Sequence, residues 1–117
     1  MCFVLFVQAQ HHINLCKQEV ISAEPQVFND KTRWYKIVVY NASEKSLDAL
    51  EWEARFYNKF NELLGVRKGV WSSGDWINPI SPGKKMTDRE LVKDIGDADK
   101  VYIKITKAHF VGGKSCD

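Results

Sequence analysis

The segment SEKSLDALEWEARFYNKFNELLG, residues 43–65, decides how the fold of this chain is interpreted. Ser43 and Ser46 are both suitable helix N-caps, and Gly65 is a suitable residue just after a helix C-terminus. On a helical wheel the charged residues gather on one side and the apolar residues on the other. The segment therefore predicts a long amphipathic helix. Its apolar arc is wider than contact with one sheet requires, which favours a second contact with another element or another subunit.

Glu53 falls in the middle of that apolar arc. A carboxylate buried without a partner is costly, so it needs an ion pair, a hydrogen bond or a proton. One interpretation is a structural ion pair with an Arg or Lys of the facing sheet. The other is a polar group inside a ligand pocket between the helix and the sheet, with walls from Trp52, Phe56 and Phe60.

The rest of the chain predicts strands, one further helix and turns. Alternating or continuous apolar residues indicate strands, and Thr87 with Glu90 forms a capping box before a helix that Gly96 ends. Ser72 to Asp75 form a plausible hairpin loop between two short apolar runs. The expected elements are strands at 2–8, 13–21, 33–40 and 99–110, a turn-rich stretch at 22–32, the hairpin at 70–80 and a short helix at 87–96.

From residue 33 onward the order is strand, helix, strand, strand, helix, strand. This is the split βαβ order (βαββαβ) of ferredoxin-like folds. We therefore expect an α+β fold with one long and one short helix, preceded by a β-rich N-terminal extension. The single domain would span 1–117, with the extension at 1–32, the core at 33–110 and a tail at 111–117.

Charge and cysteine content limit the possible partners and compartments. The 17 Lys and Arg against 15 Asp and Glu give a net charge of +2, which by itself indicates neither a nucleic acid nor a membrane. The cysteines are Cys2, Cys16 and Cys116, an odd number without a CxxC pair, which is typical of a reducing compartment although a Cys16–Cys116 bridge stays open. We expect a cytoplasmic protein, with residues 1–9 a strand or, alternatively, a truncated signal peptide.

No metal, cofactor or local catalytic constellation is expected. His11 and His12 are adjacent, so in a strand they point to opposite faces and do not bind one ion together. No nucleophile, base and orienting group stand at a recognisable local spacing. If the protein is an enzyme, Glu53 and a histidine, with His109 as the candidate, would act as acid and base.

An alternative is a single-stranded nucleic-acid-binding module. Basic residues stand close to aromatic ones in 31–36 and 66–71, and 83–86 adds two lysines. Bases stack on aromatic side chains while Lys and Arg contact phosphates. The candidate residues for this function are Arg33, Trp34, Lys36, Arg67, Lys84 and Lys85.

The supply of tryptophan favours a different class, a non-enzymatic binding protein. Trp and Tyr are enriched at interface hot spots, and this chain has four tryptophans. On the expected hairpin Trp71 and Trp76 would be cross-strand neighbours, one mostly buried and one at the rim of a functional surface. We expect a homodimer that binds a protein partner or a small apolar ligand and no membrane. The candidate binding residues are Trp52, Glu53, Phe56, Phe60, Trp71 and Trp76.

Overall fold

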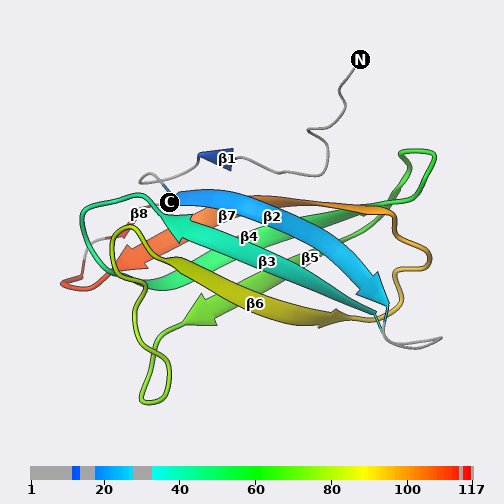
Figure 1. Ribbon diagram of the computed structural model, residues 1–117. Helices are drawn as coiled ribbons and strands as arrows, with labels where there is room; N and C mark the ends of the chain where they lie inside the picture. Colours follow the sequence, from blue (N-terminus) through cyan, green and yellow to red (C-terminus); the bar gives the residue numbers. More distant parts are fainter. Residues whose placement is uncertain (1–11, 14–17, 28–32, 114, 117) are drawn as a thin grey trace.

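The computed structural model describes residues 12–13, 18–27, 33–113 and 115–116, and these residues form strands and no helix (Figure 1). Six long strands and two strands of two residues make two antiparallel sheets. The strands are β1 (His12–Ile13), β2 (Gln18–Val27), β3 (Arg33–Asn41), β4 (Leu47–Tyr57), β5 (Leu63–Ser72), β6 (Lys85–Val92), β7 (Lys100–Phe110) and β8 (Ser115–Cys116).

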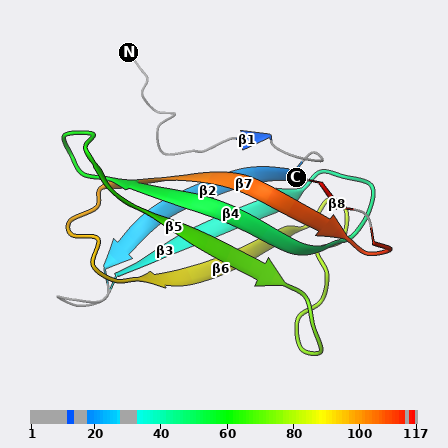
Figure 2. The ribbon, with the colours of Figure 1, turned by 180° about the vertical axis from the view of Figure 1, so that it is seen from behind.

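The two sheets pack face to face, as Figure 2 shows from behind. One sheet has the strand order β1-β2-β3-β6 and the other has the order β5-β4-β7-β8. Their inner faces share one hydrophobic cluster, in which β3 and β4 lie at the centre. Strands β2 and β7 lie close together on one side of the molecule. Strands β5 and β6 are the free edges of their sheets on the other side.

Residues 43–65 form a β-hairpin, so the predicted long helix is wrong. From Leu50 to Phe56 every second residue of β4, including Trp52, is buried, while the residues between them face outward. This is the period of a strand with one buried face. The turn after β4 is closed by Asn58, whose Oδ1 accepts hydrogen bonds from the backbone N–H of Phe60 at 2.8 Å and of Glu62 at 3.0 Å. The wide apolar arc arose because residues that alternate with a period of two were plotted on a wheel with the 3.6-residue period of a helix.

The predicted short helix at 87–96 is also wrong, because β6 occupies Lys85–Val92. This strand pairs with β3 along its whole length, with Met86 and Val92 buried on its inner face. Thr87 and Glu90 point to opposite faces and form no capping box. Pairing and burial override weak local propensities. The α+β, ferredoxin-like βαββαβ fold is therefore replaced by an all-β arrangement in the described part of the chain.

Of the other predicted elements, two strands are confirmed, while the turn-rich stretch and the hairpin differ from the structure. The strands at 33–40 and 99–110 are confirmed as β3 and β7. The stretch at 22–32 was expected to be turn-rich, but β2 continues through Pro25 to Val27. Among the described residues, β1 pairs with β2 only at Glu19 and Val20, so no described strand adjoins Pro25 on the outer side of β2, where a proline is tolerated. No second strand follows Ser72 in a hairpin, and the expected strand at 2–8 lies outside the described residues.

A hydrogen bond across the core joins the two central strands. The indole N–H of Trp52 on β4 donates to the hydroxyl of Tyr35 on β3 at 2.8 Å, and both side chains are buried. The Tyr35 ring packs edge-on against Phe56, with centroids 5.5 Å apart. Burial raises the pKa of Tyr35 to about 12, so its hydroxyl stays protonated. The Trp52 indole lies directly over Gly69 of β5, where a Cβ atom would fall inside the ring.

Gly69→Ala tests whether this packing is required. The added methyl group collides with a buried indole that has no room to move, so we expect the free energy of unfolding to fall by about 1–3 kcal/mol. Gly74→Ala is the matched control, because nothing lies within 4 Å of its added Cβ atom. Urea unfolding of both variants measures the difference. Equal stability of the two variants would contradict the packing of Trp52 on Gly69.

Candidate functional site

The loop of residues 73–80, called here the anchored loop, is fixed at both ends to the start of β4. At one end the Ser73 N–H donates to the Asp48 carbonyl at 2.8 Å. At the other end Leu47 and Ile80 exchange two backbone hydrogen bonds, of 2.9 and 2.8 Å. The fully buried Asn41 adds a third tie, because its Nδ2 donates to the Ile80 carbonyl at 2.8 Å. The loop is therefore held in place by hydrogen bonds, although Ile80 is the one residue of the loop that is buried.

A tight turn at the tip of the anchored loop presents Trp76 to solvent. Gly74 and Ile77 are joined by two backbone hydrogen bonds, of 2.8 and 3.3 Å, with Asp75 and Trp76 between them. Trp76 is 95% exposed, and Ile77 beside it is also exposed. Figure 1 shows the connection from β5 to β6 projecting from the molecule at the end opposite the β4–β5 turn. A tryptophan displayed on a hydrogen-bonded turn is unusual enough to mark a candidate contact point.

Beside this turn lies an open groove of about 500 Å³, called here the loop groove. The anchored loop forms one wall, and the end of β5 and the start of β6 form the rest. Trp71, which is 8% exposed, contributes an aromatic wall at the end of β5. The residues lining the groove are Trp71, Ile77, Asn78, Pro79, Ile80, Ser81, Lys84, Lys85, Met86, Thr87 and Asp88.

The predicted pocket around Glu53 does not form, because residues 43–65 contain β4, a turn and the start of β5 in place of the predicted helix. Trp52 and Phe56 fill the core between the sheets. Glu53 lies on the outer face of β4, where its carboxylate accepts a hydrogen bond from Arg55 Nε at 2.9 Å. Phe60 is 82% exposed on the β4–β5 turn, far from the anchored loop. The interpretation of Glu53 as part of an apolar helix face is therefore wrong.

Trp71 and Trp76 both belong to the region of the loop groove, but they are not cross-strand neighbours. Trp71 ends β5 with its indole buried, whereas Trp76 follows on the turn of the anchored loop. The expected hairpin is wrong because the chain leaves one sheet after Ser72 and enters the other at Lys85. The turn that does form spans only Gly74–Ile77 and pairs no long strands.

The structure divides the nucleic-acid candidates between different surfaces. Trp34 and Lys36 lie on the outer face of β3, and Lys85 pairs beside Tyr40 on that same face. Arg33 instead forms an ion pair with Asp97. The guanidinium of Arg67, on the other sheet, donates to the Val66 and Lys93 carbonyls, and Lys84 lines the loop groove.

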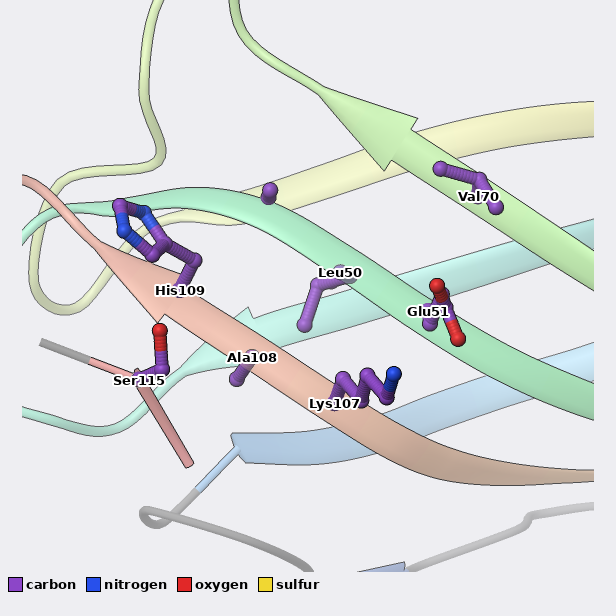
Figure 3. A pocket seen from close by; sticks show the side chains of 8 residues that line it. Leu50, Glu51, Val70, Lys107, Ala108, His109 and Ser115 are labelled. Carbon is purple, nitrogen blue, oxygen red and sulfur yellow. The ribbon is translucent and has the colours of Figure 1, made fainter. Parts of the chain in front are cut away.

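His109 faces a shallow hollow of about 200 Å³ on the outer side of the β5-β4-β7-β8 sheet (Figure 3). Its Nδ1 lies 2.6 Å from Asp48 Oδ1, and Ser115 of β8 is its cross-strand partner. A carboxylate that orients a histidine is one part of a general-base arrangement. Lys107 and Ser115 also line the hollow, but it is open to water, which weakens the stabilisation that such donors give to a developing negative charge, so we assign no reaction to it.

Glu53 and His109 do not act on one substrate atom. Glu53 pairs across from Lys104 and Ala49 pairs across from His109, so the two positions are four residues apart along β4. At about 3.3 Å per residue this separation is roughly 13 Å. Asp48 is the partner of His109 that sequence reasoning missed. The two residues are 61 positions apart, and no local pattern connects them.

The edge strand β6 carries two carboxyl groups on its inner face. Asp88 and Glu90 share that face with Met86 and Val92 and are partly buried. Burial, together with a hydrogen bond and the charge of Asp88, raises the pKa of Glu90 to about 7. Inward-facing charges on an edge strand oppose pairing with another strand. The edge strand β5 carries the charged side chain of Arg67, which opposes pairing in the same way. Binding by addition of a strand is therefore disfavoured at both edges.

The raised pKa of Glu90 makes stability depend on pH. The unfolded carboxyl loses its proton near pH 4.5, whereas the folded carboxyl keeps it to about pH 7. Because the folded state binds more protons in this window, we expect stability to be highest at its acid end and to decline as pH rises through it. Glu90→Gln should flatten this slope, and Arg89→Gln, on the opposite face of β6, should keep it. Urea unfolding across this pH range measures both. An unchanged slope in Glu90→Gln would contradict the assignment.

Comparison with protein-family models, with curated proteins and with solved structures finds no match to this chain. Among the residues that the structure describes, no group of three or more His, Cys, Asp and Glu side chains is placed to hold a metal ion. The same residues include no helix with the length and apolar character needed to cross a membrane.

Proposed function

We propose that this chain is a non-enzymatic binding module that holds a protein partner through the anchored loop. The observation that carries the proposal is the 95% exposed Trp76 on a hydrogen-bonded turn. Tryptophan contributes large binding energies where it enters a desolvated pocket. A loop that is already ordered loses little conformational entropy on binding, which favours affinity.

A protein surface fits this site better than a small apolar ligand. The aromatic residues first assigned to a ligand pocket, Trp52 and Phe56, are used by the core. The loop groove is open along its length and has lysines on its lining, unlike the enclosed apolar cavities that bind small molecules. We further propose a cytoplasmic location, supported by three cysteines without a CxxC pair.

Trp76→Ser tests the proposal directly. The protein is immobilised and exposed to a lysate of the cells that produce it, after nuclease treatment and at raised salt. We expect one protein to be retained by the wild type and lost with Trp76→Ser. Because the indole is almost fully exposed, the substitution should leave the urea unfolding curve unchanged.

Phe60→Ser is the matched control, since it removes another exposed aromatic side chain from a turn at the opposite end of the molecule. It should retain the same protein as the wild type. Retention that survives in Trp76→Ser, or that Phe60→Ser abolishes, would contradict binding through the anchored loop.

Single-stranded nucleic acid is the second candidate, favoured by Trp34, Lys36 and Lys85 on one face of β3 and β6. If the anchored loop is the working surface, titration with a labelled oligonucleotide should show no tight binding at any salt concentration. Nucleic-acid binding would instead weaken steeply with salt, because phosphate contacts release counterions. Tight, salt-sensitive binding that is lost in Lys36→Glu would replace the proposed function with the nucleic-acid one.

A further inference from the structure

The geometry points to a second copy of this chain as the partner at the anchored loop. In this arrangement Trp76 of each copy enters the loop groove of the other copy. The inference rests on the proposed function, and it adds the identity of the partner and the surface that receives the tryptophan.

Shape is the first argument. The tip of the anchored loop projects the 95% exposed Trp76, and the loop groove lies next to it, with Ile77 on its lining. The other apolar residues on that lining are Trp71, Pro79, Ile80 and Met86. At about 500 Å³ the groove lies within the range of pockets that enclose ligands larger than one indole ring. A projection and a matching hollow therefore occur side by side on one molecule.

Charge is the second argument. Asp75 precedes Trp76 at the tip of the turn, whereas the groove is lined by two lysines, Lys84 and Lys85, and by one carboxylate, Asp88, so that its charged lining residues are net positive. Within the described residues of one chain, no ion pair is formed by Asp75, Lys84 or Lys85. An inserted Trp76 brings Asp75 to the lysines of the other copy, which gives an electrostatic match at the entrance of the groove. The same Asp75 makes insertion of this tip into an anionic lipid surface unfavourable.

Symmetry and area set the expected strength. Because the projection and the groove lie at the same end of the molecule, one two-fold axis produces both contacts and closes the assembly at a dimer. Two inserted tryptophans bury about 300–500 Å² of their own surface and a similar area of the walls that they cover, which together stay below about 1,200 Å², the area at which standard interfaces begin. The dimer should therefore be weak and visible as a dependence of mass on concentration. Pairing through the β5 or β6 edges is opposed by Arg67 and by Asp88 with Glu90.

Sedimentation equilibrium of the full chain over a wide range of concentration tests the inference. We expect a monomer–dimer equilibrium in the wild type and in Phe60→Ser. Trp76→Ser should raise the dissociation constant about tenfold or more, as loss of an interface hot spot does. Asp75→Lys should also weaken the dimer, and combining it with Lys84→Asp and Lys85→Asp should restore the affinity. If Asp75 only stabilised its own loop, the added Lys84→Asp and Lys85→Asp substitutions would not restore the affinity of the dimer.

Each other result overturns the inference. A wild type that stays monomeric, or a dimer that Trp76→Ser leaves intact, excludes the second copy at this site. Binding of the monomer to vesicles of phosphatidylcholine and phosphatidylserine, lost in Trp76→Ser, would identify a lipid surface as the partner instead. The proposed function is judged separately, because a monomeric protein that still retains another protein through Trp76 satisfies it.

Discussion

The hydrogen bond from the Trp52 indole to the Tyr35 hydroxyl is the contact on which the rest of the structure depends. It joins the central strands of the two sheets, whose inner faces share one hydrophobic cluster. Removing either partner would leave a buried polar group without its hydrogen bond, which costs about 1–3 kcal/mol in addition to the lost packing. The indole also requires a residue without a side chain at Gly69, and this requirement fixes β5 against β4.

Strand β5 connects this contact to the candidate site. The strand continues from Gly69 to the buried Trp71, and Ser73 then bonds to Asp48 at the start of β4. The other end of the anchored loop is held by Leu47 and by the amide of Asn41. A loop that displays an apolar tip is stable in this position because its backbone is tied to the core at both ends. The charged groups on the inner faces of the two edge strands oppose the addition of another strand on this side of the molecule.

The sequence predicted those strands whose own residues carry an unambiguous alternation. Val101, Ile103 and Ile105 separate cleanly from Tyr102 and Lys104, and β7 forms as expected. The β4–β5 hairpin was missed because suitable helix caps and a wide apolar arc matched the helical period well enough. The evidence for a hairpin is the alternation from Leu50 to Phe56, followed by a turn at Asn58. To recognise it, the strand period of two has to be compared with the helix period of 3.6 over the same residues.

The candidate site was predicted only in part. The choice of Trp71 and Trp76 came from residue type, and residue type does not tell which indole is buried. The packing of Gly69 on Trp52 and the ties of the anchored loop decide this, and both connect residues far apart in the chain. Contacts between distant segments also bring Asp48 to His109 and turn Asp88 and Glu90 toward the inner face of β6. Contacts between distant segments leave no local pattern in one sequence.

The most direct test is hydrogen exchange at the four tryptophan indole N–H groups, followed by NMR in heavy water and assigned with single Trp→Phe variants. We predict that the Trp52 indole proton exchanges slowest, since it is buried and bonded to Tyr35, and that the Trp76 proton exchanges fastest when the protein is dilute. A Trp52 proton that exchanges as fast as that of Trp76 would contradict both the link between the sheets and the fixed position of the anchored loop.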